Sequence, residues 1–119
     1  MGKATIDATI LAHRGWVSRF KTGFDGINTE YFELASTEDH NACDLGWWLN
    51  KDESRVLLGP DVHEHIRAIH ARFHQICGSL ASLLNQRMAG QQYKKQLHEL
   101  DALSKEIVSI LLHARDKQP

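Results

Sequence analysis

The segment PDVHEHIRAIHARFHQICGSLASLL, residues 60–84, carries the strongest helix signal in the chain. Its apolar residues recur at three- and four-residue steps over about six helical turns, and they are Val62, Ile66, Ile69, Phe73, Ile76, Leu80 and Leu83. Pro60 is tolerated in the first turn of a helix, and Asp61 can cap it. The segment therefore predicts a long amphipathic helix that buries one face.

Two further amphipathic helices flank this segment. Gly90 interrupts the pattern, and a final stripe follows at Tyr93, Leu97, Leu100, Leu103, Ile107 and Leu111. Upstream, a first helix is predicted from the stripe Ile6, Ile10, Val17 and Phe20, in which His13 fills the one place without an apolar residue. Residues 42–49, ACDLGWWL, predict one or two helical turns, and a short helical piece is expected near residues 31–34. Because no segment alternates as a strand does, we expect an all-α fold, an antiparallel four-helix bundle with one short helix.

Length and composition are those of an ordinary globular domain. The 119 residues are 42% apolar and 24% charged, which predicts one domain over residues 1–119. Fourteen Lys and Arg against fifteen Asp and Glu leave a net charge of −1, so nucleic acid and anionic membrane surfaces are not expected partners. No stretch approaches the roughly 20 apolar residues of a membrane span, and two cysteines are too few for a disulfide framework, which favours the cytoplasm.

Eight histidines and only two prolines point to helices that hold a metal. His70 and His74 are four residues apart, so both leave the same face of the long helix and can converge on one ion. A partly buried or surface pair without metal is the alternative. His13 lies in an apolar stripe, where an unpartnered imidazole is costly, and Cys43 lies in a turn rich in Gly and Trp. One thiolate and three imidazoles suit tetrahedral zinc and leave no place for a catalytic water, so we expect no enzyme.

Three motifs carry a family resemblance over nearly the whole chain: residues 13–16 (HRGW), 43–49 (CDLGWWL) and 70–74 (HARFH). A histidine on the first helix, a Cys-x-x-Gly-x-Trp turn and a His-x-x-x-His pair, in this order, resemble the chemoreceptor zinc-binding (CZB) domain. The resemblance implies a four-helix bundle that binds one zinc, often as a homodimer, in the bacterial cytoplasm. The ligands that it implies are His13, Cys43, His70 and His74. It also implies that Gly46 and Trp48 support the turn that carries the cysteine.

Members of this family are usually joined to output modules, which are chemotaxis receptors or diguanylate cyclases that make cyclic di-GMP. The resemblance implies a sensory domain that responds to zinc and, through Cys43, to oxidants such as hypochlorous acid. The chain carries one helical domain, so it resembles a stand-alone family member or an excised sensor. A zinc-bound cysteine is a thiolate, which oxidants attack, and sulfenic acid would bind the metal more weakly. We expect residues 43–49 to be the moving element.

Other residues near these motifs have two interpretations. Cys77 follows His74 by about one turn. By default it is a small buried residue, because free cysteine is among the most buried residue types. The alternatives are that it approaches the metal or pairs with an oxidised Cys43. Asp44 or a backbone carbonyl could accept a hydrogen bond from a ligand imidazole. Trp16 and Trp48 are expected in the core, with a dimer interface as the second choice.

The remaining histidines are predicted to be outside the site. His63 and His65, near the start of the long helix, are expected to be exposed, with a role as spare ligands as the alternative. The others are predicted to lie on the surface, and they are His40, His98 and His113.

Two other functions remain as alternatives to a zinc sensor. A hemerythrin-like diiron or oxygen-binding bundle is also helical and rich in histidine, but it needs carboxylates and further histidines at helical spacing. A small metallohydrolase would need an open zinc position.

Overall fold

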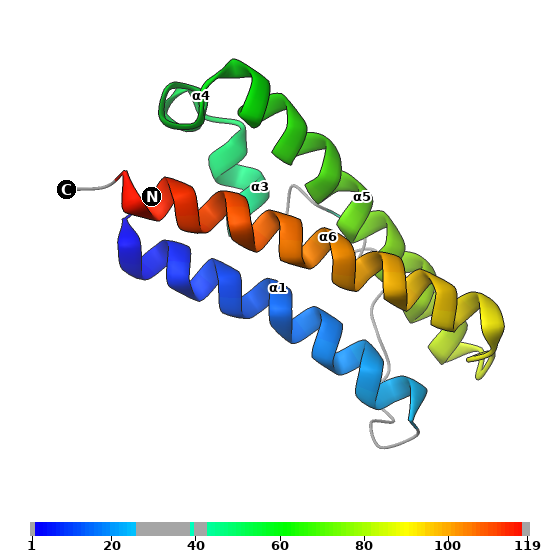
Figure 1. The fold of residues 1–119 in the computed structure, drawn as a ribbon. Helices are drawn as coiled ribbons and strands as arrows, with labels where there is room; N and C mark the ends of the chain where they lie inside the picture. Colours follow the sequence, from blue (N-terminus) through cyan, green and yellow to red (C-terminus); the bar gives the residue numbers. More distant parts are fainter. Residues whose placement is uncertain (1, 26–38, 40–42, 118–119) are drawn as a thin grey trace.

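The structure, a computed structural model, describes residues 2–25, 39 and 43–117. Within these residues it contains five helices and no strand, which confirms the predicted all-α bundle. The helices are α1 (Lys3–Phe24), α3 (Asp44–Leu49), α4 (Asp52–Leu58), α5 (Pro60–Asn85) and α6 (Gln91–Asp116) (Figure 1). The short helical piece expected near residues 31–34, and His40, lie outside the described residues.

The central helix α5 begins where the sequence predicts. Pro60 occupies its first turn, where the missing backbone N–H would have no partner in any case. Gly59 precedes it with a φ of 84°, a left-handed conformation that glycine adopts at little cost and that turns the chain sharply from α4 into α5. α5 ends at Asn85, five residues before Gly90, which is the residue before α6.

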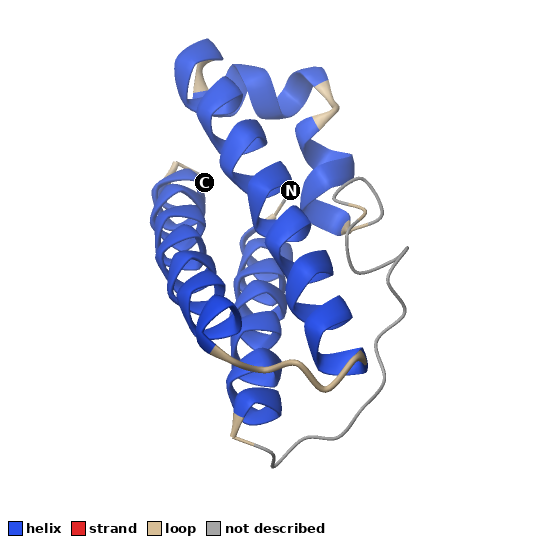
Figure 2. Ribbon diagram, turned by 90° about the vertical axis from the view of Figure 1, so that its right-hand side faces the viewer, coloured by secondary structure: helices blue, strands red, loops and turns tan. Residues whose placement is uncertain are grey.

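The three long helices form the body of the molecule. α6 packs against α1 and α5 and runs antiparallel to both, and α1 also contacts α5 (Figures 1 and 2). Each predicted stripe supplies fully buried core residues, among them Ile6, Phe20, Ile66, Phe73, Leu100 and Ile107. The hydroxyl of Tyr93 donates a hydrogen bond of 2.7 Å to the carbonyl of Phe20, which ties the start of α6 to α1.

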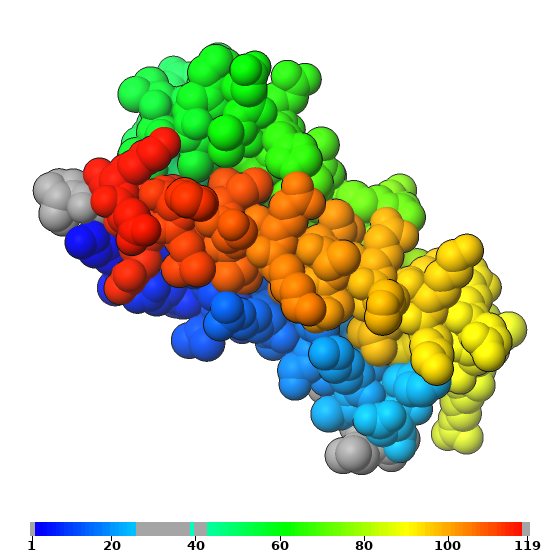
Figure 3. Space-filling view, viewed as in Figure 1, coloured from blue at the N-terminus to red at the C-terminus, as the bar shows by residue number. Residues whose placement is uncertain are grey.

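Residues 44–58 form two short helices, whereas the sequence pattern predicts one. α3 and α4 contact each other, and both pack against α5. α4 and the start of α5 lie beside the C-terminal end of α6 (Figure 3), where Lys117 Nζ donates to the carbonyl of Leu57 at 3.4 Å. Helix α4 was missed because only Ser54 and Leu58 of its seven residues are buried, too few to produce an apolar period.

Candidate metal centre

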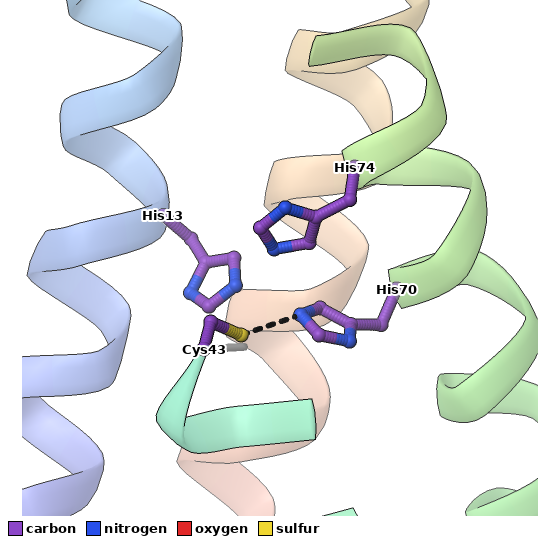
Figure 4. A group of neighbouring side chains, drawn as sticks. All are labelled: His13, Cys43, His70 and His74. Carbon is purple, nitrogen blue, oxygen red and sulfur yellow. Dashed lines mark hydrogen bonds between the residues drawn. The ribbon is translucent and has the colours of Figure 1, made fainter. Parts of the chain in front are cut away.

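Four side chains from three helices that are distant in sequence converge inside the bundle. His13 projects from α1, His70 and His74 from successive turns of α5, and Cys43 stands at the N-cap of α3 (Figure 4). One ligand atom from each side chain lies within 4.8 Å of the other three. The structure therefore brings together all four residues that the sequence motifs single out.

The backbone of α1 holds His13 in one orientation. Its Nδ1 lies 2.8 Å from the carbonyl oxygen of Thr9, and because a carbonyl can only accept, Nδ1 carries the proton. The other ring nitrogen, Nε2, is then left with a lone pair. It is buried and makes no hydrogen bond within the part of the chain that the structure describes. A buried acceptor of this kind needs a partner, and a metal ion shared with neighbouring ligands would supply one.

Cys43 reaches the histidines because it caps the start of α3. Its backbone is extended, and its sulfur accepts a hydrogen bond from the backbone N–H of Gly46 at 3.4 Å. This conformation places Sγ 3.1 Å from Nε2 of His70. Gly46 and Trp48 are both buried, so the turn that carries the sulfur is anchored in the core next to the site.

The three imidazoles meet edge to face. The ring centroids of His70 and His74 are 4.7 Å apart, and that of His13 lies 5.2 Å from His70 and 5.9 Å from His74. Each of the three rings is at most 3% exposed. Phe73 packs against His13 and His74, with centroid separations of 5.2 and 5.5 Å. The phenyl ring therefore covers one side of the cluster with an apolar surface.

Burial decides the protonation of His13 and Cys43 in the absence of metal. Desolvation lowers the pKa of His13 from 6.5 to about 4, opposed by the hydrogen bond with Thr9 and aided by His74. His13 is therefore neutral at pH 7, which is the form that binds metals. Burial raises the pKa of the Cys43 thiol, so the sulfur keeps its proton until a metal displaces it.

The four donors fit a tetrahedral ion of the size of zinc. With Zn–N and Zn–S bonds of about 2.0 and 2.3 Å, the ligand atoms of one site stand about 3.3 to 3.6 Å apart. The Cys43–His70 pair is already close to this separation, and no pair exceeds 4.8 Å. Side-chain shifts of about 1 Å would close the shell.

Two predictions about neighbouring residues are resolved by the geometry. The hydrogen-bond acceptor for His13 is the Thr9 carbonyl and not the Asp44 carboxylate, whose side chain is exposed. Sequence reasoning could not name Thr9, because every residue carries a backbone carbonyl. Cys77 is fully buried and lies outside the four-residue group, which confirms its interpretation as a small core residue. Burial raises its pKa far above the usual range.

The prediction for His63 is wrong. Its side chain is 5% exposed, and Nε2 lies 2.7 Å from the carbonyl oxygen of Leu49. The side chain is buried because α3 covers this turn of α5, which the position near the helix start did not reveal. His65 is exposed as expected and pairs with Glu106 of α6. The surface positions of His98 and His113 are confirmed.

The three tryptophans occupy different environments. Trp48 is 4% exposed, as predicted for a core residue. Trp16 is half-buried and stacks on Phe20, with 5.9 Å between ring centroids. Trp47 is 64% exposed, and Nζ of Lys51 lies 3.8 Å from its ring centroid. Helix α3 therefore carries one buried and one solvent-facing indole beside the site.

No protein-family model, curated protein or solved structure matches this chain. Among the described residues, no helix combines the length and apolar character that crossing a membrane requires.

Proposed function

We propose that this protein is a zinc-binding sensory or regulatory domain without catalytic activity of its own. The observation that carries the proposal is the group formed by His13, Cys43, His70 and His74, whose ligand atoms lie within 4.8 Å of one another inside a helical bundle. The resemblance of the three sequence motifs to the CZB domain points to the same ligands and the same metal.

The chemistry of the donors favours zinc. Thiolate and imidazole are borderline-soft ligands that suit zinc, whereas magnesium and calcium prefer oxygen. The group contains no carboxylate, and a hemerythrin-like diiron centre would require carboxylate ligands. Four protein ligands would fill the tetrahedral shell, and a hydrolytic zinc keeps one position for water. The proposed site is therefore closed, and closure supports a role other than hydrolysis.

Cys43 is the proposed switch within this site. Bound to zinc it would be a thiolate, and oxidation to sulfenic acid would weaken its bond to the metal. Loss of that ligand would release the start of α3, which carries Trp47 and Trp48. The signal would then pass from metal or oxidant to the packing of α3 against α5. By resemblance, the output would be a chemotaxis receptor or a cyclic di-GMP enzyme, in a bacterial cytoplasmic homodimer.

Metal content tests the proposal directly. Protein purified without added metal is analysed by elemental mass spectrometry for the wild type and for Cys43→Ala, with Cys77→Ala as the matched control. Cys77 is a thiol of the same bundle that lies outside the group. We expect about one zinc per chain in the wild type and the control, and less, or more easily chelated, zinc in Cys43→Ala. A wild type without zinc, or zinc indifferent to Cys43, would overturn the proposal.

Tryptophan fluorescence tests the switch separately. Chelation or hypochlorous acid should change the emission of the zinc-loaded wild type, because Trp47 is solvent-exposed and Trp48 is buried on the same short helix. Unchanged emission after complete zinc removal would refute the movement of α3 and leave a structural zinc site.

A further inference from the structure

His63 is a buried histidine outside the proposed ligand set. Its Nε2 lies 2.7 Å from the carbonyl oxygen of Leu49, and because the carbonyl accepts, Nε2 carries the proton and donates. Leu49 is the last residue of α3. The last carbonyls of a helix have no partner within the helix, so they need one from elsewhere. His63 thus supplies a hydrogen bond that α3 cannot make for itself.

Helix α3 is attached to α5 at both of its ends. Cys43, at the start of α3, contacts His70, and Leu49, at its end, accepts from His63. His63 and His70 lie on the buried face of α5 seven residues apart, a rise of about 10 Å, and the helical path from residue 43 to residue 49 rises about 9 Å. The two lengths match. α3 therefore lies antiparallel to this part of α5, with one polar contact at each end.

The length of α3 makes these end contacts important. A helix of six residues has too few internal hydrogen bonds to be stable alone, so its position depends on its surroundings. Leu45, Trp48 and Leu49 pack into the core, and the polar contacts of Cys43 and of the Leu49 carbonyl add to this packing at the two ends. Because Cys43 is at one end, a tilt at the other end would move its sulfur away from the histidines.

We infer that His63 is a positioning residue for the metal site: its hydrogen bond to the Leu49 carbonyl holds α3 in the orientation in which Cys43 reaches the ion. The inference rests on the proposed metal site, since it assigns a role to a residue that supports one of the four ligands. It also accounts for the burial of a histidine that the metal does not need.

Cobalt(II) binding to the full chain tests this inference, because a cobalt–thiolate bond gives a near-ultraviolet charge-transfer band that reports Cys43 directly. Affinity and band intensity are compared for the wild type, His63→Leu and His63→Gln. The amide nitrogen of Gln stands as many bonds from the backbone as Nε2 of His, so it can donate to the same carbonyl. The control is His98→Leu, which makes the same chemical change at an exposed position of α6.

We expect His63→Leu to bind cobalt about tenfold more weakly, the effect of one lost buried hydrogen bond, with a weaker thiolate band. His63→Gln and His98→Leu should stay within about twofold of the wild type. In a Cys43→Ala background, His63→Leu should change the affinity by less than about twofold, because the residue acts through the cysteine.

The outcomes separate the two proposals. If the wild type binds no cobalt, the metal site and the positioning role both fail. The positioning role alone fails if the wild type binds cobalt and His63→Leu lowers only the melting temperature. It also fails if His63→Leu lowers the cobalt affinity by the same factor in the wild-type and Cys43→Ala backgrounds. If His63→Leu loses its helical circular dichroism, His63→Asn replaces it, since its shorter amide cannot reach the carbonyl. Failure of both variants to fold would assign His63 to the fold and overturn the inference.

Discussion

Acidification should destabilise the metal-free protein through His13. Burial lowers the pKa of this imidazole from 6.5 to about 4. As the pH falls, the unfolded chain takes up the proton near 6.5, whereas the folded protein keeps the ring neutral until about 4. Between these values the unfolded state binds more protons, so the free energy of unfolding decreases on acidification. The stability that the neutral, buried imidazole contributes is fully present above pH 6.5 and is lost as the pH approaches 4.

The expected loss is about 3 kcal/mol, from about 1.4 kcal/mol for each pH unit between the two pKa values. The side chain is 3% exposed, so solvent screens it little. Urea unfolding with a chelator present, between pH 7 and pH 4, measures the effect for the wild type and His13→Leu. The variant lacks the titrating group but keeps the other ionisable groups, so the pH dependence of the difference isolates His13.

The direction of that difference tests the reasoning. Relative to His13→Leu, the wild type should lose about 3 kcal/mol on going from pH 7 to pH 4. His98→Leu, at an exposed position, should show no such change against the wild type. A difference between the wild type and His13→Leu that stays constant within about 1 kcal/mol would show that His13 is not buried in its neutral form.

Three further outcomes are expected. Zinc binding should release about one proton per chain at pH 7, because burial raises the pKa of the Cys43 thiol and the metal must displace its proton. Calorimetry in buffers of different ionisation enthalpy measures the proton release, and no release would contradict a buried thiol. Chelation should leave most of the far-UV circular dichroism in place, because the apolar core joins α1, α5 and α6 without the metal, and a large loss of helicity would instead indicate a zinc needed for folding. Tyr93→Phe should lower the free energy of unfolding in urea by about 1 kcal/mol, because it removes the hydrogen bond to the Phe20 carbonyl, and the zinc content should be unchanged because this contact lies outside the ligand group.

The helices could be predicted from the sequence because their signals are local. Apolar residues at helical spacing mark the buried faces of α1, α5 and α6, and Pro60 and Gly90 mark where two of these helices begin. Helix α4 left no such mark, because Val56 on its outer side is apolar and 83% exposed. In a segment of seven residues, one exposed apolar side chain is enough to hide the period.

The candidate ligands could also be named from the sequence, although their meeting could not be derived from spacing alone. Spacing by four residues puts His70 and His74 on one face of any helix, whatever surrounds it. His13 is distinctive because it is a polar residue in an apolar stripe. The placement of Cys43 beside them depends on how α3 lies on α5, and only the resemblance of the motifs predicted it.

The sequence alone is enough to predict the helical period, the buried faces and the kinds of donor that the chain offers to a metal. Only the packing of the helices shows that Thr9 orients His13, that Asp44 faces solvent and that His63 is buried against Leu49. This difference arises because a helical period is encoded within a few neighbouring residues, whereas burial and hydrogen-bond partners depend on which helices pack together. His63 lies near the start of α5, where a side chain would usually meet water. Helix α3 packs there instead, and its last carbonyl, that of Leu49, contacts the imidazole.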